Sequence, residues 1–169
     1  MKWFERSFPS NTPTWMYSSL LERLRGTPAR LEERMTIIPN LYLIIKLENK
    51  WSIQENIGHL FDLEPLWSNR VTDILLGHEK LRPTDLANSA TDLANHNAQP
   101  ISNLLEKFRT ARAEFVVKLE NLNPADYDKT ALHPRLNTPM SLLDTMYFVA
   151  EHDDHHLGMI SSIFRKLKN

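Results

Sequence analysis

The chain of 169 residues contains no cysteine. Disulfides, thiolate nucleophiles and cysteine–zinc sites are therefore excluded, and any sulfur chemistry would need a thiol cosubstrate. Glycine is also scarce, with four residues, whereas ten prolines are present and fall mainly at the expected ends of segments. Few glycines and many punctuating prolines favour helices joined by ordered loops.

A surplus of one charge sign and long apolar runs are missing as well. The formal net charge is −1 and no basic stripe stands out, so nucleic acid is not an expected partner. No apolar run is long enough to cross a membrane. The stretch 1–8 carries charges among its apolar residues, unlike a signal peptide, so we expect a cytoplasmic protein.

What is present fits one folded unit. Hydrophobic residues make up 41% and charged residues 24% of the chain, which is ordinary for a globular protein. A length of 169 residues suits one domain, and we expect that domain to span 1–169.

Four long segments show helical spacing of apolar residues, and no segment shows convincing strand alternation. The segments run from about 13 to 38, from Ser52 through an apolar series ending at Ile74, from about 100 to 121, and from Thr138-Pro139 to about 167. Four long amphipathic helices predict an all-α protein, a four-helix bundle.

Local signals refine these helices. Thr27-Pro28 resembles a fresh helix start, so the first segment is either one bent helix or two. Ser52 and Glu55 have the spacing of a capping box at the start of the second segment. Pro65 removes a backbone donor within the second segment, which predicts a kink there.

Three of the seven histidines crowd into the last helix. Helical geometry places His152 and His156 one turn apart on the same side, whereas His155 is rotated about 100° from His156 and points towards solvent. Two imidazoles one turn apart can both reach a single ion at about 2.0–2.1 Å. The H-x-x-x-H spacing therefore indicates a metal-binding pair, although surface pairs of this type also arise by chance.

A third ligand has to come from another helix. His59 lies at the edge of the apolar face of the second helix, which is the kind of position that His152 occupies. We expect the bundle to bring His59 to the pair, although a lone histidine there could equally be an ordinary, partly buried side chain. The remaining histidines lie at a helix end or in loops and are left out: His78, His96 and His133.

Two acidic residues fall inside apolar helix faces, where an unpaired carboxylate would be costly. Asp153 lies near the centre of the apolar face of the last helix, and Glu64 lies within that of the second. One hypothesis is that one or both carboxylates accept the second N–H of a metal-bound imidazole and orient it. The alternative is that each pairs with a buried arginine. A solvated face explains the other nearby acids: Glu55, Asp62, Glu151 and Asp154.

Other site chemistries have weaker support. A carboxylate-bridged di-iron bundle needs E-x-x-H on two helices, but here the candidate pairs, Glu55 with His59 and Glu151 with His155, are spaced four residues apart. The sequence has no H-E-x-x-H, phosphate-binding loop, G-x-G-x-x-G or G-x-S-x-G motif.

The order and spacing of these motifs resemble a known family. Trp51–Leu60, followed by Asp62-Leu63-Glu64 and Trp67, resembles the second-helix signature of the DinB/YfiT-like superfamily. His133–Leu136 and Ala150–Leu157 resemble the last-helix region of that superfamily. The similarity covers nearly the whole chain.

This resemblance implies a four-helix bundle of up-and-down type with unusual handedness, often dimeric, so a homodimer is possible here. It also implies a divalent metal ion, commonly zinc or nickel, on three histidines that correspond by position to His59, His152 and His156. The superfamily includes thiol-dependent transferases, which use bacillithiol or mycothiol, and metal-dependent hydrolases. Glu64-Pro65 departs from its pattern and could shift His59 relative to the other two histidines.

Three histidine ligands leave an open coordination position, as in catalytic metal sites. We therefore expect a metal-dependent enzyme, a hydrolase or a thiol S-transferase, that activates water or a thiol cosubstrate for reaction with a small molecule. No catalytic residue is assigned, although Asp153 could be a general base if it does not orient a histidine. The alternatives are a non-catalytic, stress-related metal- or ligand-binding protein and a purely structural helical module.

Overall fold

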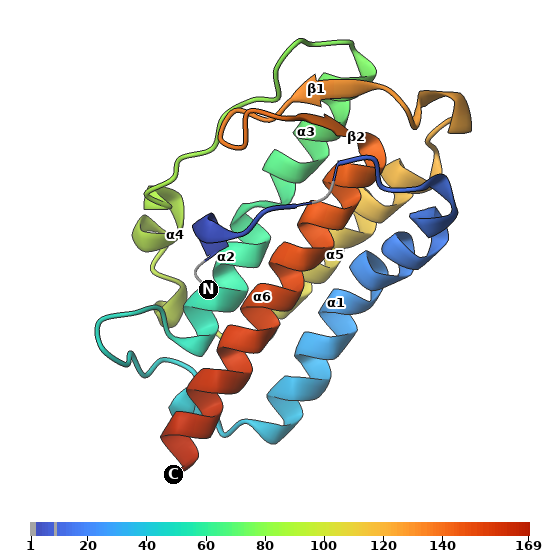
Figure 1. Cartoon of the computed structure of the whole chain (residues 1–169). Coiled ribbons are helices and arrows are strands. Elements are labelled where there is room, and N and C mark those ends of the chain that lie inside the picture. Colours follow the sequence, from blue (N-terminus) through green and yellow to red (C-terminus); the bar gives the residue numbers. More distant parts are fainter. Residues whose placement is uncertain (1–2, 9) are drawn as a thin grey trace.

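The computed structural model describes residues 3–8 and 10–169 of the chain. Its long helices pack side by side as a four-helix bundle (Figure 1), which confirms the expected fold class. One member of the bundle is formed by two consecutive helices, α2 and α3. The bounds are α1 Tyr17–Ile37, α2 Ile53–Asp62, α3 Glu64–Leu75, α5 Ile101–Glu120 and α6 Leu142–Lys168.

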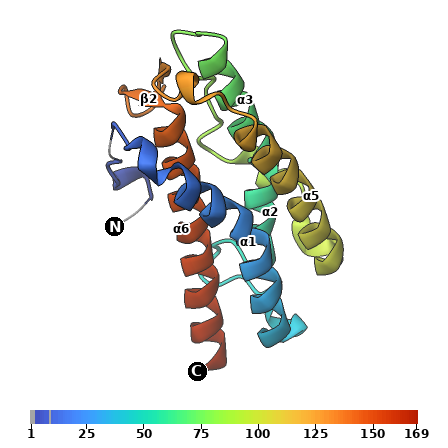
Figure 2. The same ribbon diagram turned by 90° about the vertical axis from the view of Figure 1, so that its right-hand side faces the viewer.

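The connection between α3 and α5 determines the arrangement of the bundle. Helices α1 and α2 each pack against both α5 and α6, which places α1 and α2 at diagonal corners. In Figures 1 and 2, α1 and α6 run from the end with the strands to the opposite end, while α2, α3 and α5 run towards the strands. Residues 76–100 therefore return along the outside of the bundle, and they carry the short helix α4, Ser89–Leu93.

The kink expected at Pro65 is a break between two helices. Helix α2 ends at Asp62, and α3 begins at Glu64 with Pro65 in its first turn, where a missing backbone N–H is tolerated. The start of α2 is as predicted, because the Ser52 hydroxyl accepts from the backbone N–H of Glu55 and the Glu55 carboxylate accepts from that of Ser52.

The first segment forms one α-helix that continues through Pro28, which decides between the two alternatives for Thr27-Pro28. The helix begins at Tyr17, after a 3-10 turn at Thr14–Met16, and not at Pro13.

The predicted start of the last helix at Thr138-Pro139 is wrong. Residues Pro139–Ser141 form strand β2, which pairs antiparallel with β1, Thr130–Leu132, so the expectation of no strands fails for these two segments. Helix α6 begins at Leu142 because a second capping box, Ser141 with Asp144, satisfies its first backbone donors. Proline is tolerated in a short strand that has a neighbour on one side only.

Buried apolar side chains gather in two clusters. Phe115 of α5 belongs to the first cluster, with side chains from α1, α3, α6 and the strands, while Phe108 belongs to the second, with side chains from α2 and the end of α6. Arg112, fully buried, lies between these two phenylalanines in the sequence of α5. Among the described residues, no helix combines the length and the apolar character needed to span a bilayer.

Candidate metal centre

The three histidines predicted as metal ligands meet in the folded chain. His59 on α2 and His152 and His156 on α6 are buried, with 4%, 4% and 6% of their surfaces exposed. Their ring centroids lie 5.3 Å (59–152), 4.8 Å (59–156) and 4.6 Å (152–156) apart. One ring nitrogen from each lies within 4.8 Å of the other two, so the break at Pro65 does not keep His59 away from the pair.

Asn56 holds the ring of His156. The amide nitrogen of Asn56 donates to the backbone carbonyl of Ser52 at 2.8 Å, which turns the amide oxygen towards Nδ1 of His156, 2.9 Å away. Because this oxygen can only accept, we assign the proton of the neutral ring to Nδ1. The lone pair then lies on Nε2, where it is free to bind a metal ion.

A second chain of hydrogen bonds holds His59. The hydroxyl of Thr91 in α4 donates to the Asp62 carboxylate at 2.7 Å, and it lies 3.1 Å from Nδ1 of His59. Since the single hydroxyl proton is used by Asp62, the oxygen accepts from Nδ1–H of His59. The lone pair of this ring is therefore also on Nε2.

The ring of His152 makes no hydrogen bond that the described part of the chain supplies, and its Nδ1 is buried without a partner. Buried polar atoms are normally paired, so an orphaned imidazole nitrogen needs an explanation. A divalent cation fits this set of donors, because two rings present an oriented lone pair and the third has no competing protein partner.

Burial keeps the three rings neutral. It lowers the pKa of His59 to about 4 and the pKa values of His152 and His156 well below the ordinary value, with the neighbouring imidazoles acting in the same direction. Neutral imidazole is the form that binds metal ions, so at neutral pH the rings need no proton release before they bind one.

Two residues that sequence reasoning set aside belong to the support of the site. The expectation that Asp62 faces solvent is wrong, since its carboxylate accepts from both Thr91 and Nε2 of His96, the latter at 2.9 Å. The His96 ring packs against Gly58, where an added Cβ would lie 2.2 Å from the ring, so only glycine leaves room for it. Glu55, also expected on a solvated face, is 8% exposed and pairs with Lys46.

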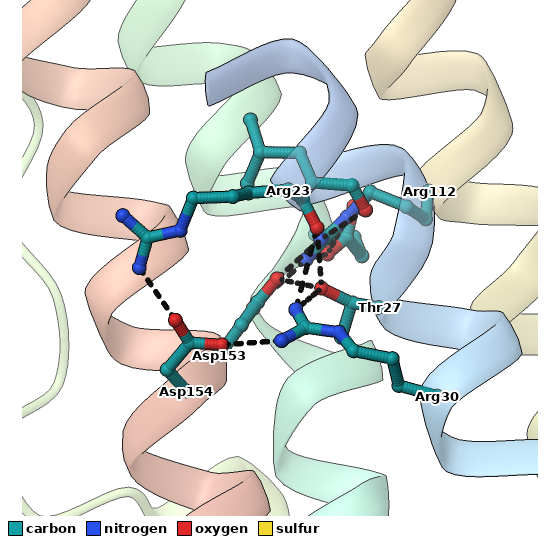
Figure 3. A network of polar contacts seen from close by, with 8 residues as sticks. Arg23, Thr27, Arg30, Arg112, Asp153 and Asp154 are labelled. Carbon is teal, nitrogen blue, oxygen red and sulfur yellow. Dashed lines mark hydrogen bonds and ion pairs between the residues drawn. The ribbon is translucent and has the colours of Figure 1, made fainter. Parts of the chain in front are cut away.

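Glu64 and Asp153 both bind Arg112, which was the alternative to a role in orienting the histidines. Arg112 Nη2 lies 2.6 Å from Glu64 Oε1 and 3.0 Å from Asp153 Oδ1. Asp153 also accepts from Thr27 at 2.7 Å, as Figure 3 shows. Within the described ranges 3–8 and 10–169, no hydrogen bond joins either carboxylate to the three histidines.

This buried cluster carries two carboxylates for one guanidinium. Burial, together with the charge of Asp153, raises the pKa of Glu64 to about 7, although Arg112 acts in the opposite direction. A raised folded-state pKa means that the folded chain binds the proton more tightly than the unfolded chain. Protonated Glu64 therefore contributes stability that is fully present below the ordinary pKa of a glutamate. This contribution is lost as the pH rises from that pKa to about 7.

The remaining acids near the histidines of α6 stay at the surface, as expected. Asp154 pairs with Arg23 and Arg30, which reach it from α1 (Figure 3), and Glu151 also pairs with Arg23. His155, which was expected to point to solvent, is half-buried because the ring of Trp3 stacks on it with centroids 5.4 Å apart.

A cavity of 730 Å³ opens next to the three imidazoles. The N-terminal segment, α2, α3, the segment around α4, the turn between β1 and β2, and α6 all contribute side chains to its wall. Its volume lies within the range of small-molecule sites.

Comparison with known proteins adds the family. A model of the DinB superfamily matches residues 20–160, which include all three histidines. The chain belongs to the DinB superfamily. No curated protein sequence matches it significantly.

Two solved structures share the fold of this chain. One is YfiT from Bacillus subtilis, described as a probable metal-dependent hydrolase with an unusual four-helix bundle topology. It is 17% identical with a TM-score of 0.84, and the match covers 97% of this chain and 94% of YfiT. The other is a mycothiol-dependent maleylpyruvate isomerase, 13% identical with a TM-score of 0.67, where the match covers 93% of this chain but only 62% of the isomerase.

Proposed function

We propose that this DinB-superfamily protein holds one divalent cation, zinc or nickel, on His59, His152 and His156 and is a metal-dependent enzyme. The observation that carries the proposal is the convergence of three buried, neutral imidazoles beside a cavity of 730 Å³. Three protein ligands leave a position for a small molecule, and the cavity gives that molecule room.

The chain's own residues orient the site. Asn56 and Thr91 fix two of the rings by accepting from Nδ1–H, so the lone pair of each of these rings is on Nε2 and is free to bind a cation. When bound, the cation would lower the pKa of a water or thiol ligand and so supply a nucleophile at neutral pH. Arg112 holds Glu64 and Asp153, so we assign neither carboxylate as general base.

Two reaction classes fit the arrangement, hydrolysis and transfer to a low-molecular-weight thiol. The first agrees with the description of YfiT, and the second with the thiol dependence of the isomerase. Since the chain has no cysteine, the sulfur in the second class must belong to a cosubstrate.

The function can be tested with protein purified without an affinity tag. We expect elemental analysis to find one equivalent of divalent metal, and the zinc, nickel or manganese form to turn over a thiol acceptor, an ester or an amide. Chelation should reduce this turnover to background. If chelation only lowers the melting temperature and no form turns over a substrate, the protein is a non-catalytic metal-binding protein instead.

Thr91→Val is expected to weaken metal binding by about 10- to 100-fold, the usual cost of losing a partner that orients a ligand. Valine has the shape of threonine but cannot accept from Nδ1–H of His59 or donate to Asp62. Thr91→Ser keeps the hydroxyl and is the matched control, with an affinity close to that of the wild type. Competition with a chromogenic chelator measures both variants, and equal affinities would show that Thr91 does not orient the ligand.

A further inference from the structure

A second group of polar side chains in the same cavity has N–H donors that are left without acceptors. It consists of Arg70 on α3 and of His133 and Arg135 in the turn between β1 and β2, all of which line the cavity. Their hydrogen bonds show which donors are in use and which are free.

The tautomer of His133 follows from its backbone contacts. The backbone N–H groups of Arg135 and Leu136 both lie 3.2 Å from Nδ1 of His133, so this nitrogen must accept. Burial and the nearby Arg70 and Arg135 lower the pKa of His133 to about 4, so the ring is neutral and has one proton. We assign that proton to Nε2, which makes Nε2–H a donor.

Nε2–H of His133 then faces another donor. Nη1 of Arg70 lies 3.2 Å from Nε2, while Nε and Nη2 of Arg70 donate to the backbone carbonyl of Arg82. An arginine cannot accept, so the two N–H groups have no acceptor between them. Arg70 is 2% exposed and His133 is 2% exposed, and leaving buried donors unpaired is costly.

Arg135 adds a third free donor. Its Nη1 reaches the backbone carbonyl of Phe4 at 3.4 Å and its guanidinium lies over the ring of that residue, but Nη2 is buried with no partner. Nε1 of Trp67, beside Arg70, is also buried with no partner.

The charges around this group leave a positive surplus. Asp73 is the acid that acts on Arg70, but both of its carboxylate oxygens bind Arg82, and His78 lies 3.3 Å from one of them. The acids that line the cavity are also engaged, since Asp85 accepts from backbone N–H groups of its own loop and Asp92 accepts from the indole of Trp51. Among the described residues, no carboxylate pairs with Arg70 or Arg135.

We propose that Arg70, His133 and Arg135 bind an oxyanion group, a carboxylate or a phosphate, of the molecule that occupies this cavity. One oxygen accepts from Nη1 of Arg70 and Nε2–H of His133, and the group also neutralises Arg135. Arginine suits this task because its planar fork matches such anions. The assignment of this anion as part of a substrate rests on the proposed function, whereas its binding does not.

The subsite lies one aromatic ring away from the histidines. The ring of Trp67 lies 5.6 Å from the guanidinium carbon of Arg70 and 5.4 Å from the ring of His152. The indole is therefore placed to contact the body of a molecule whose anionic end binds the arginines and whose reactive end faces the three imidazoles.

The test uses benzoate as a carboxylate probe, benzamide as its neutral counterpart and phenyl phosphate as the phosphate probe. Calorimetry on the full chain, both zinc-loaded and chelator-treated, measures their affinities. We expect benzoate to bind both forms and benzamide to bind neither, and Arg135→Gln to weaken benzoate binding by at least about tenfold. Lys50→Gln removes the same charge from the cavity wall at a lysine paired with Glu48, and should change the affinity by less than about twofold.

Arg70→Lys is a second variant, used if Arg135→Gln lowers the melting temperature, and should weaken benzoate binding in the same way.

Tighter binding of phenyl phosphate than of benzoate would assign a phosphate, and the reverse would assign a carboxylate. Equal binding of benzoate and benzamide, or of benzoate to Arg135→Gln and Lys50→Gln, would overturn the proposal, as would benzoate binding only when zinc is present. His59→Ala should lose the metal but is expected to retain benzoate binding. The metal-site proposal and the anion-subsite proposal can therefore fail independently of each other.

Discussion

Replacing His156 with alanine is expected to abolish stoichiometric binding of zinc or nickel. Loss of a residue that only orients a ligand costs about 10- to 100-fold in metal affinity, so loss of a ligand itself should cost more than about 100-fold. His156 is the best variant for this purpose because Asn56 fixes its tautomer, which leaves Nε2 free for the cation. Elemental analysis and competition with a chelator measure the effect.

His155→Ala is the matched control. This histidine is the immediate neighbour of His156, but it packs under Trp3 and its Nδ1 lies 3.3 Å from Arg6. We expect the control to bind metal as the wild type does. A metal site that survives His156→Ala but not His155→Ala would contradict the assignment of the ligands, and a site that survives both would leave the three imidazoles without a role in metal binding.

Replacing Arg112 with methionine is expected to lower the free energy of unfolding by about 3–5 kcal/mol, the cost of breaking a buried ion pair from one side. Arg112, Glu64 and Asp153 are 1%, 3% and 0% exposed, so water cannot replace the lost guanidinium. Methionine fills part of the space, but the two carboxylates would face each other with no cation between them. Urea denaturation near neutral pH measures the change.

Arg109→Gln, three residues earlier on α5, is the control for loss of an arginine from this helix. Arg109 pairs with Glu32 at the surface, where both side chains are more than a third exposed, so this variant should cost no more than about 1 kcal/mol. Similar stabilities of the two variants would show that the cluster around Arg112 does not hold ionised carboxylates. Protonation of the carboxylates at lower pH should narrow the gap between Arg112→Met and the wild type.

The pair of histidines on the last helix could be predicted because helical periodicity is a local property. Residues four apart lie on one face wherever the helix is placed, so the pairing of His152 with His156 needed no knowledge of the fold. His59 could be predicted only as a candidate at a helix edge, and the resemblance to a family added the third position. Its meeting with the other two depends on α2 packing against α6.

The residues that support the site could not be predicted in the same way. Thr91 and His96 lie in a polar connection with no motif, and they reach His59 and Asp62 because residues 76–100 return along the outside of α2. Arg112 was foreseen only as an unnamed arginine that would pair with Glu64 and Asp153. Such partners lie 32 to 48 positions apart in sequence, and nothing in local spacing connects them.

The sequence by itself determined the helical bundle, the capping box at Ser52, the break near Pro65 and the histidine pair on the last helix, because each follows from interactions within a few turns of chain. The tertiary structure decided which nitrogen of each ring is free, which carboxylates are neutralised by Arg112, and that two arginines share a cavity with the histidines. Those features depend on burial and on contacts between distant segments, and both exist only once the helices have packed.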